Sequence, residues 1–111
     1  MATELVLLSD VPLTEEVHHR AYKRLGITGE MLEWLDGQVS TLHDETGQHI
    51  LTVHAPMVIH DAREAAAALV DPPGAFGLWS DIMVPFDNTE KGRTVAEAIA
   101  AEIGGLIRER I

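Results

Sequence analysis

The chain has 111 residues, 46% of them hydrophobic and 23% charged, a composition that indicates one globular domain over residues 1–111 and excludes a disordered, collagen-like or coiled-coil chain. Eight Lys and Arg against eighteen Asp and Glu give a formal net charge of −10, and a field of that sign disfavours nucleic acid and anionic membranes as partners. Without cysteine, disulfides and thiolate chemistry are excluded, and because signal-peptide and membrane-spanning patterns are also lacking, the sequence predicts a cytoplasmic protein.

The first third of the chain predicts a strand and then a helix. Residues 4–9 form an apolar run, as expected of a strand that is buried on both faces. A helix is expected over residues 14–25, because Thr14 can cap it, Glu residues fill its first turn, and basic residues precede Gly26. His18 and His19 are adjacent on this helix and are expected to lie in solvent. A second, short helix is expected over residues 28–35.

The middle of the chain predicts a β-hairpin. Residues 39–43 and 48–55 have the composition of strands, and residues 44–47 lie between them as a turn. Gly47 suits the left-handed position of a type I turn with a G1 bulge, which would place His43 opposite His49 and Val39 opposite Val53.

The remaining elements complete an α+β pattern. A capped helix is expected over residues 61–70, a strand over residues 76–84, and an amphipathic helix over residues 88–110. The order β-α-β-β-α-β, followed by a helix, predicts a ferredoxin-like (split β-α-β) two-layer sandwich, with a four-stranded antiparallel sheet and an added C-terminal helix.

The histidines and one aspartate are the candidates for chemistry. His43 and His49 face each other in the expected hairpin and are weak candidates for a metal site, with Asp44 or Glu45 as a third ligand; a pair of polar cross-strand neighbours is the simpler interpretation. His54, His60 and Asp81 are the candidate catalytic residues of an enzyme or ligand-binding protein, in a pocket between the sheet and the C-terminal helix. The sequence contains no phosphate-loop, dinucleotide, nucleophile-elbow or zinc-protease motif, and it predicts no cofactor.

The sequence favours a non-catalytic protein-binding or regulatory module, such as an inhibitor or immunity-type protein for a basic partner. The small enzyme described above is the alternative. Self-association as a homodimer is also predicted, through apolar surface that the domain cannot cover by itself. The expected binding surface combines exposed apolar and acidic residues, namely Trp34, Leu42, Ile50, Glu30 and Glu33.

Overall fold

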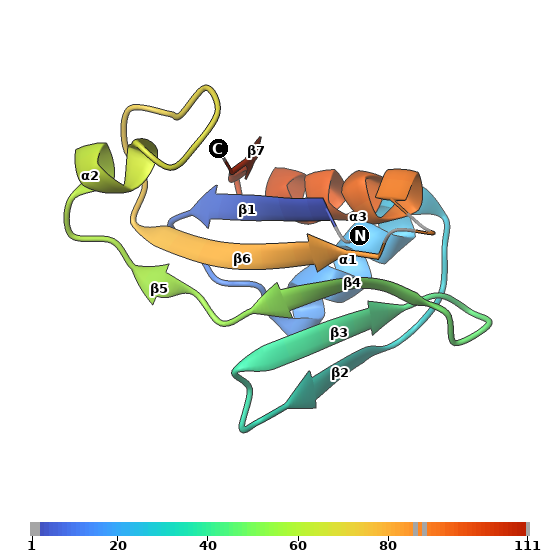
Figure 1. Cartoon of the computed structure of the whole chain (residues 1–111). Coiled ribbons are helices and arrows are strands. Elements are labelled where there is room, and N and C mark those ends of the chain that lie inside the picture. Colours follow the sequence, from blue (N-terminus) through green and yellow to red (C-terminus); the bar gives the residue numbers. More distant parts are fainter. Residues whose placement is uncertain (1–2, 86, 88, 111) are drawn as a thin grey trace.

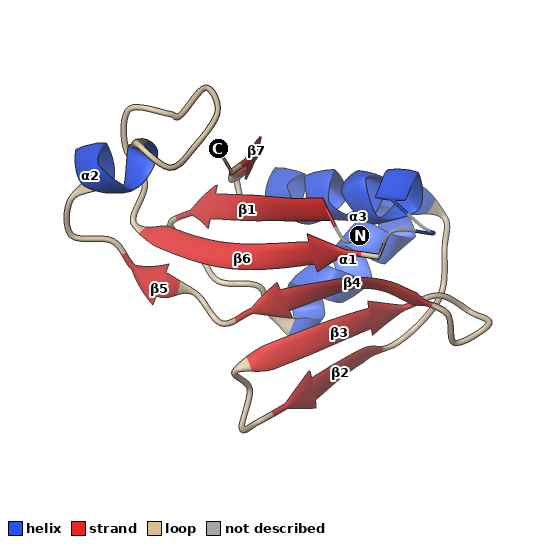
Figure 2. Cartoon of the chain, in the orientation of Figure 1, coloured by secondary structure: helices blue, strands red, loops and turns tan. Residues whose placement is uncertain are grey.

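The computed structural model describes residues 3–85, 87 and 89–110, which form an antiparallel sheet and three helices (Figures 1 and 2). The predicted α+β class and antiparallel sheet are therefore confirmed. In chain order the elements are β1 (Thr3–Ser9), α1 (Glu15–Leu25), β2 (Met31–Trp34), β3 (Val39–His43), β4 (His49–His54), β5 (Met57–Val58), α2 (Ala62–Ala66), β6 (Leu78–Val84), α3 (Thr89–Glu102) and β7 (Leu106–Glu109).

The sheet is wider than the sequence predicted. Its strands follow the order β2-β3-β4-β6-β1-β7, and β5 also pairs with β6. Every strand pair is antiparallel. The prediction of four strands is wrong, because β2 and β7 were expected to be helical and β5 to be a connecting segment. The ferredoxin-like arrangement is not confirmed.

Helices α1 and α3 cover one face of the sheet, which we call the helix side (Figure 2). The main core lies between them and the sheet. It contains Val17 and Tyr22 of α1, Val95 and Ile99 of α3, and inward residues of five strands: Leu5, Leu7, Leu42, Ile50, Leu51, Val53, Ile82, Val84 and Ile107. Successive residues of a strand point to opposite faces, so the neighbours of most of these residues lie on the other face.

The second face of the sheet is covered at one end only. Val6 and Leu8 of β1 and Trp79 of β6 pack there against Leu69, which follows α2. This small second core explains why β1 is apolar on both sides, as expected for a central strand with cover on both faces.

Helix α1 has the predicted caps, but one of its histidines is buried. Thr14 accepts a hydrogen bond from the Val17 amide, and Gly26 adopts a left-handed conformation with φ of 69°. His18, expected in solvent, is only 1% exposed, and its ring lies edge-on against Tyr22 with 4.2 Å between centroids. The prediction for His18 is wrong because this position belongs to the buried stripe of the helix.

Residues 31–34 form an edge strand and not the predicted short helix. Met31, Leu32 and Trp34 satisfy both a helical and an alternating pattern, so periodicity alone cannot separate the two in so short a run. Gly29 decides the geometry: its φ is 153°, and a Cβ at this position would collide with the carbonyl of His43. The chain therefore passes closely beside β3, and β2 pairs with it.

The C-terminal helix ends earlier than predicted. Gly104 takes a left-handed conformation with φ of 65°, and the Gly105 amide donates to the Ala100 carbonyl at 2.8 Å, which are the features of a Schellman stop. The expected helix over residues 88–110 is instead α3 followed by β7, which pairs with β1. The first residue of that expected helix, Asn88, lies outside the described residues.

Candidate functional site

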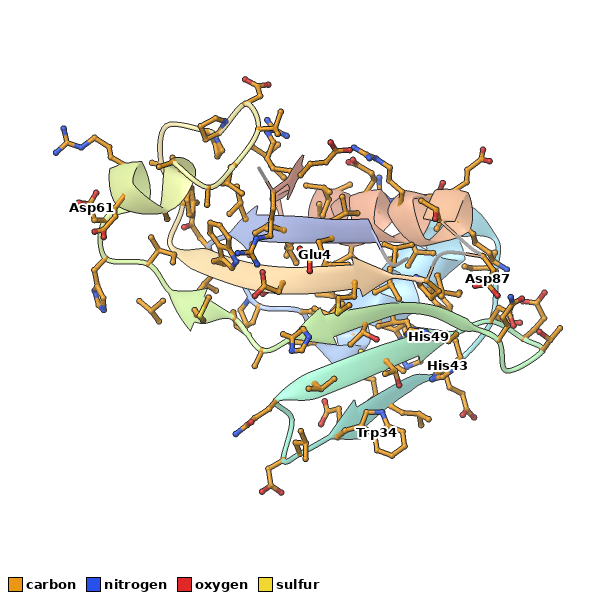
Figure 3. The ribbon with its side chains drawn as sticks, in the orientation of Figure 1. Glu4, Trp34, His43, His49, Asp61 and Asp87 are labelled. Carbon is orange, nitrogen blue, oxygen red and sulfur yellow. The ribbon has the colours of Figure 1, made fainter. Side chains whose placement is uncertain are left out.

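A large part of the second sheet face has no covering helix. We call this surface the open face: it is the side of β2, β3, β4 and the end of β6 that points away from α1 and α3 (Figure 3). Cross-strand pairs build it in rows, with Leu32 beside Thr41, Thr41 beside Thr52, and Thr52 beside Met83. The side chains of the open face are Leu32, Trp34, Val39, Thr41, Thr52, His54 and Met83.

The aromatic and apolar side chains of the open face are accessible, and the tryptophan among them is held by a hydrogen bond. Trp34 is 52% exposed, and its indole Nε1 donates to Thr41 Oγ1 at 2.9 Å. Leu32 and Met83 are each 40% exposed. Met57 of β5, 53% exposed, pairs with Trp79 and extends the apolar surface. A tryptophan fixed by a cross-strand hydrogen bond loses little freedom when it is buried by a partner.

His43 and His49 are cross-strand neighbours, as predicted, with their ring centroids 5.8 Å apart. Their nitrogens have protein partners: His43 Nε2 lies 3.0 Å from Thr41 Oγ1, and His49 Nε2 lies 2.8 Å from Thr52 Oγ1. Among the described residues no group of three His, Cys, Asp or Glu side chains is arranged to hold a metal ion. Both hydrogen bonds lie within a single strand, β3 for His43 and β4 for His49, and the contact between the two rings runs across the strands.

Asp44, considered as a third ligand, organises the hairpin turn instead. Its carboxylate accepts from the Thr46 hydroxyl and from the amides of Thr46 and Gln48, and Lys91 Nζ of α3 lies 3.2 Å away. The Thr46 hydrogen bond is the main cause that holds the pKa of Asp44 well below its usual range. The carboxylate ties the hairpin turn to α3.

The three candidate catalytic residues do not come together. His54 and Asp81 line one pocket of about 120 Å³ with Glu4 and Arg110, whereas His60 lines a separate depression beside α2. The expected place is also wrong, because Asp81 lies on the sheet face opposite α3.

Asp81 already has two protein partners. It accepts from Trp79 Nε1 at 2.9 Å and lies 3.3 Å from Arg110 Nη1. The guanidinium of Arg110 in turn stands 5.9 Å over the Trp79 ring. This network joins β6 to the C-terminal end of the chain.

The predicted binding surface is divided by the fold. Trp34, Glu30 and Glu33 are exposed on or beside β2. Leu42 and Ile50 are fully buried in the main core, so they are not part of any surface. The predicted binding surface did not include Leu32, Met57 and Met83, which the sequence placed in the short helix over residues 28–35, in the segment between the hairpin and the next helix, and in the strand over residues 76–84.

Charge is distributed unevenly along the chain. Residues 26–62, which include β2, β3, β4 and β5, contain no Lys or Arg and six carboxylates, Glu30, Glu33, Asp36, Asp44, Glu45 and Asp61. This third of the sequence therefore carries −6 of the total −10. Only Asp44 among these six has a Lys or Arg within ion-pair distance in the described structure. The signal was readable in the sequence as a long run without basic residues.

Comparison of the chain with family models, with curated proteins and with solved structures finds no match. In the described part of the chain, no helix is both long enough and apolar enough to cross a membrane. The open face and the acidic stretch of chain that forms most of it are therefore the grounds for a functional proposal.

Proposed function

We propose that the chain is a non-catalytic protein-binding module that engages a basic protein partner through the open face. One observation carries the proposal: an uncovered, partly apolar sheet surface is built, except for Met83 of β6, from the stretch of chain that has six carboxylates and no Lys or Arg. Inhibition of a basic enzyme is one form that such binding takes.

The composition of the open face supports short-range recognition. Interfaces use a few aromatic and apolar anchors surrounded by polar residues. Trp34, Leu32 and Met83 are such anchors, and the threonines and His54 of the open face offer hydrogen bonds. The carboxylates around them supply long-range attraction for a positively charged protein.

Two other expectations receive less support. Catalysis by His54, His60 and Asp81 would require that they converge, and His60 lines a different depression from the other two. A homodimer through Leu42 and Ile50 loses its basis, because both side chains are buried. A second copy on the open face would bring two stretches of −6 charge together, which opposes that contact.

The test is affinity capture followed by measurement with the purified partner. Wild-type protein and a Trp34→Ala/Met83→Ser variant serve as baits, and a Val70→Ala variant is the matched control, since Val70 is 49% exposed and lies outside the open face. We expect a partner rich in Lys and Arg, whose affinity falls by about 30-fold or more in the double variant, the loss typical of an aromatic hot spot. The control should bind like wild type.

Equal affinity of the captured protein for the double variant and for wild type would contradict the proposal. So would a partner of net negative charge. Light scattering of the isolated chain tests the competing occupant, because a stable dimer that the double variant disrupts would assign the open face to a second copy.

A further inference from the structure

We infer, on the premise of the proposed function, that the partner adds an extended segment of alternating apolar and basic residues to the sheet, as a new strand along the free edge of β2. The open face would then receive the apolar side chains of that segment. Strand addition of this kind takes its affinity from main-chain hydrogen bonds and its specificity from alternate side chains.

The strands at the two ends of the sheet order, β7 and β2, differ in their availability to a partner. Strand β5, which pairs with β6 beside this path, has only 2 residues and is too short to receive a strand. The β7 edge is blocked, because the Val70 amide donates to the Glu109 carbonyl, Leu69 forms a bridge with Arg110, and Arg108 Nε donates to the Asp71 carbonyl at 2.7 Å. At the other edge, β2 is the last strand of the order, and no described strand pairs with its outer side.

The register identifies the free backbone groups of β2. The His43 amide donates to the Glu30 carbonyl, so the main chain of Glu30 faces β3. Because main-chain groups of alternate residues in a strand point to the same side, Leu32 and Trp34 also pair with β3. The N–H and C=O groups of Met31 and Glu33 therefore point away from the sheet.

The side chains of β2 specify the pattern of an added strand. Leu32 and Trp34 lie on the open face, and Glu33 is exposed on the helix side, opposite Ser40. An added strand thus places one set of side chains beside an apolar pair and the alternate set beside a carboxylate. Apolar residues suit the first set and Lys or Arg the second.

The negative charge of Glu33 favours a basic partner over a second copy of the chain at this edge. A charged side chain on a short edge strand is a device that opposes pairing with other chains. In a β2-to-β2 dimer Glu33 would lie close to its own copy, and like charges across a strand pair are unfavourable. A basic segment turns the same residue into an attraction, which gives specificity as well as affinity.

The probe is the synthetic peptide Lys-Val-Lys-Val-Lys-Val-Lys, titrated into the ¹⁵N-labelled full chain. A block peptide of the same composition, Lys-Lys-Lys-Lys-Val-Val-Val, controls for charge. We expect the alternating peptide to bind more tightly and to slow hydrogen exchange at the Met31 and Glu33 amides. A Glu33→Pro variant removes the outward N–H, which an edge strand tolerates, and should lower affinity by about tenfold more than Glu33→Gln, which removes only the charge.

Several results overturn the inference. They are equal binding of the two peptides, unchanged exchange at Met31 and Glu33 in the bound state, or no binding of the alternating peptide up to about 1 mM. The exchange measurement on wild type decides the matter even if Glu33→Pro fails to fold. If this inference fails, the proposed function still stands when the captured partner binds the Trp34→Ala/Met83→Ser variant more weakly than wild type, because that variant tests the open face and not the edge of β2.

Discussion

Replacing Gly92 with alanine tests how closely α3 lies on the sheet. Gly92 is buried in α3, and a Cβ there would overlap Val84 Cγ1 and lie 2.8 Å from the Ile50 carbonyl oxygen. Neither neighbour can easily retreat, because Val84 is fully buried and the carbonyl is part of β4. Next to Gly92, where α3 lies close to the sheet, Lys91 forms an ion pair with Asp44 of the hairpin turn.

Two effects of opposite sign act on Gly92→Ala. Alanine favours a helix interior over glycine by about 1 kcal/mol, whereas overpacking a rigid core costs about 1–3 kcal/mol. Since the clash involves main chain and a core side chain, we take the upper end of that cost. The free energy of unfolding is therefore expected to fall by about 2 kcal/mol.

Urea denaturation followed by far-ultraviolet circular dichroism measures the change. Gly74→Ala is the matched control, because nothing lies within 4 Å of a Cβ at Gly74. It should leave stability unchanged or raise it by up to about 1 kcal/mol through the unfolded chain. If Gly92→Ala proved as stable as wild type or more stable, helix propensity would outweigh the contact, and the described approach of α3 to β4 and β6 would be refuted.

Three further predictions concern stability. Gly29→Ala should destabilise the protein more than Gly92→Ala does in the same urea assay, because a Cβ at Gly29 would meet the rigid main chain of β3 while φ stays at 153°; an equal or smaller loss would contradict the close passage. Burial, with His19 as a further cause, lowers the pKa of His18, so wild type should lose stability as the pH falls below about 6.5, where an unfolded histidine gains its proton. Between about pH 7 and 5.5 the His18→Leu variant should lose less of its free energy of unfolding than wild type does, and parallel curves of stability against pH for the two proteins would refute this. Because the folded-state pKa of Asp44 is depressed, the contribution of its carboxylate to stability is complete above about pH 4 and is lost as the pH falls further. The difference in stability between wild type and Asp44→Ala should therefore become smaller in acid, and a difference that stays constant would contradict this prediction.

The turn of the hairpin was predicted correctly from the sequence, but the register of its strands was not. Gly47 has the expected left-handed φ of 85°, and His43 does lie opposite His49. Beyond them the register shifts by one residue at a bulge between Leu42 and His43, so Val39 pairs with His54 and not with Val53. A shift of one residue exchanges the two faces of a strand.

That shift explains the main error in the predicted surface. Leu42 pairs with Leu51 in the core, and the bulge lets Ile50 and Leu51 both be buried. The position of a bulge depends on how β4 packs against α3 and β6, and these contacts are distant in sequence. Trp34, by contrast, was identified correctly as exposed, although its element was expected to be helical.

The polar partners of Asp81 were also not predicted from the sequence. The sequence offered Asp81 as a candidate catalytic residue, whereas in the structure it contacts Trp79 of the same strand and Arg110, which follows β7. Arg110 was expected on a helix. Its contact with Asp81 exists only because Gly104 and Gly105 turn the chain back along β1, a long-range pairing that local patterns do not encode.

The uneven cover of the sheet and the uneven charge of the chain concern the same residues. Helix α2 closes one end of the second face over Trp79 and Leu8, where the Arg110 guanidinium lies nearby. The other end is formed by the stretch without Lys or Arg and exposes Trp34. The carboxylates of this stretch attract a basic protein over a Debye length of about 10 Å, and the exposed side chains of the open face contact it at short range. Both effects therefore favour binding at this end of the sheet. The exposed Trp34 and the carboxylates without a Lys or Arg partner come from the same stretch of chain, although Glu33 points to the helix side of β2. The proposal of a basic partner therefore rests on the open face together with the acidic stretch that forms most of it, and not on the net charge alone.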